Sequence, residues 1–110
     1  MFKTTVKIGD FTKGVGVRFF RPNTDLTICE LKIGDKNTHP KDMETKFEGQ
    51  SQRFNPDQFD RCRGHLNAME KAMNAANLGK EARAVIYKAY GEWAVNQNIR
   101  TRISIDKIGN

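Results

Sequence analysis

Basic side chains alternate with apolar ones near both ends of this sequence. Lys3 and Lys7 are separated by threonine and valine, and Arg100 and Arg102 are interleaved with isoleucine and threonine. In a strand, such alternation places the cations on one face and the apolar residues on the other. A face of cations and hydroxyls without carboxylates can bind the phosphates of nucleic acid and release their counterions. The same composition is also an ordinary hydrated sheet face, and charge alone does not separate these two interpretations.

A third basic segment contains an aromatic residue between two cations. Phe20 lies between Arg18 and Arg21, where its ring could stack on an unpaired base. The competing interpretation places Phe20 in the hydrophobic core. The predicted nucleic-acid interface comprises Lys3, Lys7, Arg18, Phe20, Arg21, Arg100 and Arg102.

The segment Gly14-Val15-Gly16 has the spacing of the first glycines in a phosphate-binding loop. It lacks the third glycine and leads into a strand, whereas a phosphate loop ends at the N-terminus of a helix. We therefore expect the two glycines to allow a bulge or a twist in a strand.

Two cysteines and two histidines raise the hypothesis of a zinc site. Cys62 and His65 fall on neighbouring positions of one predicted helix, and Cys29 with His39 could supply the other pair of ligands. The separation of Cys29 and His39 matches no common zinc finger. Cys62 also belongs to an apolar stripe, where a small buried thiol is ordinary. We therefore predict no metal and no other cofactor.

One group of residues could suggest an enzyme. Asp25 followed by Glu30 and Lys32 is similar to the carboxylates and lysine of metal-dependent nucleases. The stretch between them is too short for the two strands on which such a site is normally built. Neither histidine has a recognisable catalytic partner in the sequence. We expect a protein without catalytic activity.

A protein-binding module is the alternative function. Tyr87, Tyr90 and Trp93 are residue types favoured at binding hot spots, and a basic face can also recognise an acidic protein surface. The alternative is thus a modulator or inhibitor of a larger enzyme or nucleoprotein complex, of the kind that mobile genetic elements encode. The competing interpretation is that these aromatics complete the core.

Length and composition set the class of molecule. The chain has 110 residues, a net charge of +6 and 37% hydrophobic residues, which predicts one folded domain over residues 1–110. No apolar run approaches the roughly 20 residues that cross a bilayer, and no signal peptide is visible at the N-terminus. Two cysteines are too few for a disulfide framework, so we expect reduced thiols in a cytoplasmic protein.

Apolar periodicity predicts the elements. A first helix is expected from an N-cap at Asn55 to a stop at Gly79, because Phe59, Cys62, Leu66, Met69, Met73 and Ala76 recur at steps of three and four. A second helix is expected to about Val95, with Ala82, Val85, Ile86, Ala89, Tyr90 and Trp93 on its apolar face. Strands are predicted at 2–8, 13–21, 26–33 and 99–105, with an extended segment at 45–53.

The order of these elements predicts an α+β fold. It consists of a mainly antiparallel sheet of about four strands with two helices packed on one face, and the other face is left open to water. The nucleic-acid hypothesis further assumes that the first and last strands are neighbours. That adjacency does not follow from the sequence.

Overall fold

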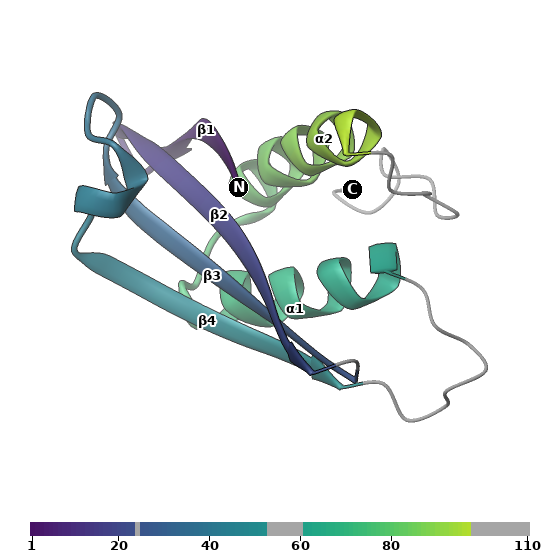
Figure 1. Cartoon of the computed structure of the whole chain (residues 1–110). Helices are drawn as coiled ribbons and strands as arrows, with labels where there is room; N and C mark the ends of the chain where they lie inside the picture. The colour runs from purple at the N-terminus through teal and green to yellow at the C-terminus, as the bar shows by residue number, and fades with distance from the viewer. Residues whose placement is uncertain (24, 53–60, 98–110) are drawn as a thin grey trace.

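The computed structural model describes residues 1–23, 25–52 and 61–97. Their elements follow the predicted order of four strands and then two helices (Figure 1). The predicted N-cap at Asn55, the stripe residue Phe59 and the strand at 99–105 lie outside the described residues. The elements are β1 (Phe2–Ile8), β2 (Phe11–Asn23), β3 (Leu26–Asp35), the 3-10 helix η1 (Pro40–Asp42), β4 (Thr45–Gln52), α1 (Arg61–Ala75) and α2 (Lys80–Asn96).

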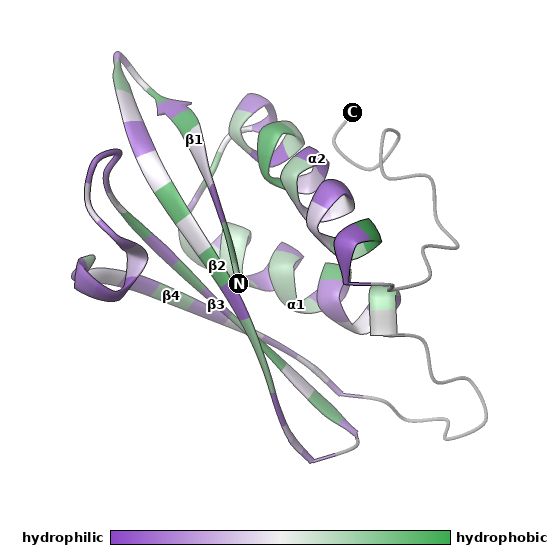
Figure 2. Ribbon diagram, turned by 45° about the horizontal axis from the view of Figure 1, so that its top comes forward, coloured by the Kyte–Doolittle hydropathy of each residue, from purple (hydrophilic) through white to green (hydrophobic). Residues whose placement is uncertain are grey.

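The four strands form an antiparallel sheet in the order β1-β2-β3-β4. The period-two patterns assign the faces correctly: Val15 and Val17 are fully buried, whereas Arg18 and its neighbours on the opposite face are not covered by helices. In Figure 2 apolar and polar residues alternate along the strands. The predicted fold class is therefore confirmed for the part of the chain that the structure describes.

Both helices cover the same face of the sheet, which we call the inner face (Figure 1). α1 packs on β3 and β4, and α2 packs on β1. Neither helix in the described part is long and apolar enough to cross a membrane. The fully buried side chains at the centre include Val15, Val17, Leu31, Met69, Met73, Ile86 and Tyr90.

The apolar stripes of the helices are mostly as predicted. Cys62, Leu66, Met69 and Met73 of α1 are buried. On α2 the prediction was wrong for Val85, which is 40% exposed. Tyr87 is buried in its place on the α2 surface that faces the core, because the helix is rotated relative to the face inferred from the pattern.

α1 lies unusually close to β4 at Gly49. A Cβ built on Gly49 would meet the carbonyl oxygen of Ala68 and would lie 2.5 Å from the backbone nitrogen of Ala72. The absence of a side chain at this position therefore sets the distance between the helix and the sheet.

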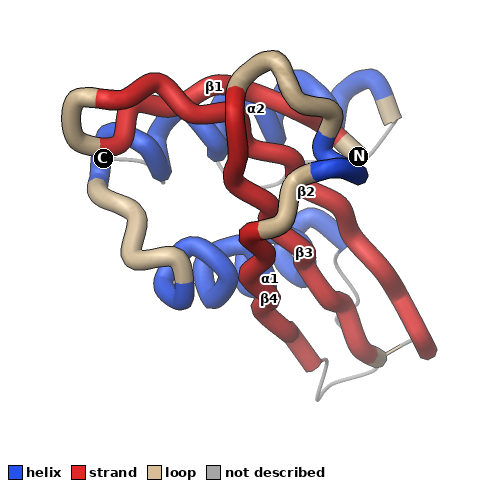
Figure 3. The backbone as a smooth tube through the Cα atoms, turned by 90° about the vertical axis from the view of Figure 1, so that its left-hand side faces the viewer, coloured by secondary structure: helices blue, strands red, loops and turns tan. Residues whose placement is uncertain are grey.

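The opposite, outer face of the sheet is only partly open, which corrects the prediction of a fully hydrated face. The connection from β3 to β4, which contains η1, folds back over it (Figure 3). Pro40 and Met43 of this connection are buried. A Cβ on Gly16 would lie 2.5 Å from the Cβ of Pro40, and one on Gly34 would lie 2.7 Å from the Cγ of Met43.

The packing of the β3–β4 connection on the sheet explains why β2 has glycine at positions 14 and 16. The pairing of β2 with both neighbours runs without a break through Gly14 and Gly16, and the irregularity lies between Phe20 and Asn23. The prediction of a bulge at the glycines was therefore wrong. They make room for the β3–β4 connection, which the pattern within a single strand could not reveal.

Candidate functional site

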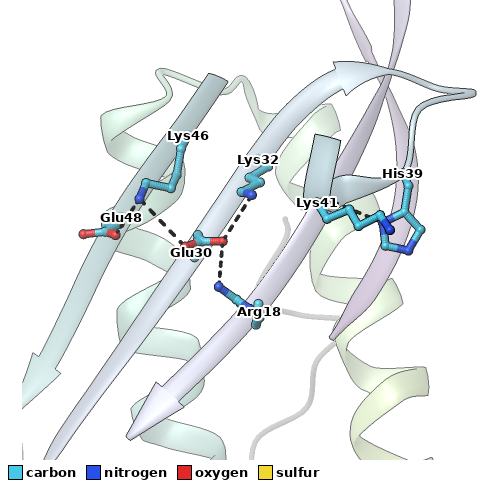
Figure 4. A network of polar contacts seen from close by, with 7 residues as sticks. All are labelled: Arg18, Glu30, Lys32, His39, Lys41, Lys46 and Glu48. Carbon is cyan, nitrogen blue, oxygen red and sulfur yellow. Dashed lines mark hydrogen bonds and ion pairs between the residues drawn. The ribbon is translucent and has the colours of Figure 1, made fainter. Parts of the chain in front are cut away.

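Three cations surround one carboxylate, Glu30, on the outer face (Figure 4). Glu30 Oε1 lies 3.4 Å from Arg18 Nη2 and 3.8 Å from Lys32 Nζ, and its Oε2 lies 3.9 Å from Lys46 Nζ. Lys46 also contacts Glu48 at 3.5 Å. Strand pairing explains the cluster, because Arg18 and Glu48 are the cross-strand partners of Glu30.

The carboxylate and the cations differ in their exposure to solvent. The Glu30 side chain is 9% exposed, whereas the side chains of Arg18 and Lys46 are 50% and 48% exposed. Glu30 is thus held at the base of the cluster, and the cations that neutralise it still reach solvent. A polyanion that approaches this surface meets the cations first.

Arg18 also lies on the ring of Phe20. Its Cζ is 4.1 Å from the ring centroid, which is the geometry of a cation–π contact. The two residues share a face because they are two positions apart in β2, and Phe20 is paired with Ile28 of β3. The planar guanidinium group of Arg18 therefore packs against the aromatic ring of Phe20.

Lys3 is on the outer face as predicted, but it has a structural contact there. Its Nζ donates hydrogen bonds to the carbonyl oxygens of Lys36 and Thr38 at 2.9 and 3.1 Å. These bonds hold the β3–β4 connection against the sheet. One of the cations predicted to bind phosphate is therefore directed at two backbone carbonyls.

The other predicted site residues divide into separate groups. Lys7 is exposed near the far end of β1 from Phe2, away from the Glu30 cluster. Arg21 is exposed within the irregular pairing that follows Phe20, so alternation does not set its face. Arg100 and Arg102 lie outside the described residues, as does the assumed contact of the first and last strands.

Sequence reasoning missed three cations of this surface: Lys32, Lys41 and Lys46. The alternation of β3 already placed Lys32 on the outer face. What the sequence lacked was the register that sets Lys32 opposite Lys46. Lys41 lies on this surface because the β3–β4 connection folds back over the sheet. The only feature of the sequence that relates to this fold-back is the presence of glycines in β2 and β3 where the connection packs.

The residues of the zinc hypothesis do not come together. Cys29 points into the core between the sheet and the helices, whereas His39 lies in the connection on the outer face. His65 Nδ1 is 3.0 Å from the hydroxyl oxygen of Tyr90. Within residues 1–23, 25–52 and 61–97, no group of three His, Cys, Asp or Glu side chains could hold a metal ion.

The chemistry of Cys29 is that of a buried structural thiol. Burial, and to a smaller extent the charge of Glu30, raises the pKa of the Cys29 thiol to about 12. Because only the thiolate is a strong nucleophile, we expect folded Cys62→Ala protein to react with Ellman's reagent about a thousandfold more slowly than the same protein in denaturant. Rapid labelling of Cys29 without denaturant would contradict this burial.

The acidic residues of the nuclease-like group also lie apart. Asp25 is exposed in the turn between β2 and β3, where its backbone N–H donates to Asn23 Oδ1 at 2.9 Å. Glu30 lies five residues further along β3, which corresponds to about 16 Å in a strand. Asp25 and Glu30 are therefore too far apart to share a metal ion.

The aromatics of the protein-binding alternative belong to the core. Tyr87 and Tyr90 are buried, and Trp93 is partly buried against them. His65 stacks on Phe19 with ring centroids 4.0 Å apart. These rings fill the space between the helices and the sheet, so they do not project as the hot-spot side chains of a binding surface.

A separate hollow of about 620 Å³ lies where the turn between α1 and α2 meets the inner face. Its lining is mainly apolar and includes Ile8, Ile33, Phe47, Leu78 and Ala82. It has no set of converging charged groups comparable to that on the outer face. The outer face is therefore the stronger candidate site among the described residues.

Comparison with known proteins adds no further information about the site. The chain matches no protein-family model, and neither curated proteins nor solved structures show a significant similarity to it.

Proposed function

We propose that this protein binds single-stranded nucleic acid on the outer face of its sheet, without catalysis and with little sequence preference. One observation carries the proposal: the exposed guanidinium of Arg18, which packs on the Phe20 ring at 4.1 Å, lies near the exposed side chain of Lys46 and the partly buried side chain of Lys32. Unpaired bases stack on guanidinium planes as well as on aromatic rings. Lys32 and Lys46 lie beside this plane to contact phosphates.

The stacked guanidinium favours single strands over duplex. A base can lie flat on Arg18 only if it is not paired and stacked within a helix. Lys32 of β3 and Lys46 of β4 attract the phosphates of the strand, and this attraction does not depend on the nucleotide sequence. The proposed interface therefore consists of Arg18, Phe20, Lys32 and Lys46, and it replaces the set inferred from sequence.

The proposal excludes catalysis because of the state of the carboxylates. Glu30 is surrounded by three cations, and Glu48 is paired with Lys46. We therefore assign these carboxylates to neutralising the cations of the surface and not to a reaction. Both cysteines are free thiols, which is consistent with the reducing cytoplasm in which we place the protein.

Affinity measured against salt concentration tests the proposal. With three cations on phosphates, log affinity for a single-stranded oligonucleotide should fall against log salt with a slope of about −2.1. The variant Lys46→Gln should reduce that slope to about −1.4, because one counterion fewer is released. Fluorescence anisotropy with a labelled oligonucleotide of mixed sequence measures both slopes.

Lys88→Gln is the matched control, because it removes the same charge from an exposed position of α2 on the other side of the molecule. It should leave the slope unchanged. Equal effects of the two variants, or no binding at 50 mM salt, would overturn the proposal. Binding of polyglutamate with the same affinity as the oligonucleotide would instead support the acidic protein partner.

A further inference from the structure

The outer face is closed at one end by the β3–β4 connection. Pro40 sits directly on Gly16, so no space remains there between the connection and the sheet. Beside this contact lies a hollow of about 170 Å³. Its lining includes Gly16, Arg18, Lys32, His39, Pro40 and Lys41, together with Glu30.

The charges that line this hollow leave a positive excess. The side chains of Arg18, Lys32 and Lys41 contribute three positive charges, and that of Glu30 contributes one negative charge, so these side chains sum to +2; Met1 also lines the hollow. Lys46 does not line the hollow, and its Nζ lies 3.5 Å from Glu48 Oε1. The hollow therefore matches an anion of about two charges better than one of a single charge.

His39 adds a directed donor. It is the N-cap of η1, and its Nδ1 accepts a hydrogen bond from the backbone N–H of Lys41 at 3.2 Å. Since Nδ1 is an acceptor, the neutral ring carries its proton on Nε2. The cap thus leaves the second ring nitrogen as a hydrogen-bond donor, and the ring lies beside Lys41 (Figure 4).

The size of the hollow and its closed end limit what can enter. Sites for whole small molecules usually occupy about 300–1,000 Å³, so this hollow has room for a group of atoms and not for a complete nucleotide. The Gly16–Pro40 contact leaves no passage between the connection and the sheet, so a strand that crosses Arg18 towards η1 meets the connection at this hollow.

We infer that this hollow binds a terminal phosphate monoester of a nucleic-acid strand. The inference rests on the proposed function and adds a preference for phosphorylated ends. A monoester carries about −1.5 to −2 charges near neutral pH, whereas a phosphate within the chain carries one. In the bound complex the guanidinium of Arg18 would contact two parts of the nucleic acid. A base would stack on the guanidinium plane, and the terminal phosphate would accept hydrogen bonds from its N–H groups.

Oligonucleotides that differ only at their ends test this inference. The same single strand is prepared with a 5′-phosphate, with a 3′-phosphate or with two hydroxyl ends, and it carries its fluorophore internally. We expect one phosphorylated strand to bind about tenfold more tightly than the hydroxyl strand, through charge-assisted hydrogen bonds. If the 5′-phosphate increases the affinity, the 5′ end of the strand lies in the hollow; if the 3′-phosphate does so, the 3′ end lies there. The comparison therefore gives the direction in which the strand crosses the sheet.

The variant Lys41→Gln locates the effect. It should reduce the preference for the phosphorylated strand to about twofold or less and leave the affinity for the hydroxyl strand nearly unchanged. Lys36→Gln is the matched control, because Lys36 belongs to the same connection and is exposed, but it does not line the hollow. The control should retain the full preference.

The outcomes separate this inference from the proposed function. If the hydroxyl strand binds and neither phosphate increases its affinity, the inference is overturned and the proposed function stands. A preference that persists in Lys41→Gln also overturns it, because the phosphate then binds elsewhere. If no strand binds but a nucleoside monophosphate does so in a manner that depends on Lys41, the phosphate site stands and the proposed function fails.

Discussion

Replacing Gly49 with alanine is expected to lower the free energy of unfolding by roughly 3 kcal/mol. The new methyl group would meet the carbonyl oxygen of Ala68 and the backbone nitrogen of Ala72, which lies 2.5 Å from the Cβ position. Backbone atoms cannot rotate away as the end of a flexible side chain can, so α1 must move off β4. Urea denaturation followed by Trp93 fluorescence measures the loss.

Gly79→Ser is the matched control for this substitution. Gly79 is the N-cap of α2 and not the stop of the first helix that the sequence predicted, since α1 already ends at Ala75; nothing lies within 4 Å of a Cβ built on Gly79. Serine is preferred at this position because its hydroxyl accepts a hydrogen bond from the first turn, so a small gain in stability of a few tenths of a kcal/mol is expected. If Gly49→Ala is as stable as the wild-type protein, the close packing of α1 on β4 is wrong.

Arg18→Lys is expected to weaken binding of a single-stranded oligonucleotide by about tenfold. Stacking of one base on a planar side chain contributes about 1–3 kcal/mol, and lysine keeps the charge but has no plane on which a base can stack. Since the number of cations does not change, the salt slope should stay at about −2.1. The substitution therefore separates the stacking contribution from the charge contribution in one anisotropy series.

Two control measurements show whether the loss comes from stacking. Lysine can still neutralise Glu30, so the free energy of unfolding should remain within about 1 kcal/mol of the wild-type value. Binding of an inorganic polyphosphate, which has no bases, should be unaffected. An unchanged affinity for the oligonucleotide, or an equal loss for polyphosphate, would show that Arg18 acts only as a charge.

The two substitutions probe different levels of the structure. Gly49 sets how closely the helical layer approaches the sheet, and Arg18 lies on the opposite face of that sheet. Gly49→Ala should therefore affect stability first and binding only through the folded fraction. Arg18→Lys should affect binding alone.

Patterns within single elements were sufficient to predict the architecture. The alternation around Val15 and Val17 identified both the strand and its buried face. The spacing of Leu66, Met69 and Met73 identified the helix and the side that packs on the sheet. These features are local, because side-chain direction in a strand or helix follows directly from position along it.

Contacts between elements could not be read in the same way. Lys3 was predicted to face a polyanion, but in the fold its Nζ binds the carbonyls of Lys36 and Thr38. The glycines of β2 were assigned to a bulge or a twist, but Gly16 packs against Pro40, which lies more than twenty residues further along the chain. Each error concerned a partner that lies far along the chain.

The sequence by itself determined the order of the strands and helices, the buried faces of β2 and α1 and the basic character of the outer face. Only the tertiary structure decided that Arg18, Lys32 and Lys46 converge on Glu30 and that the β3–β4 connection closes one end of their surface. The physical reason is register: the pairing of neighbouring strands brings specific side chains together, and their identity depends on the packing of the whole sheet.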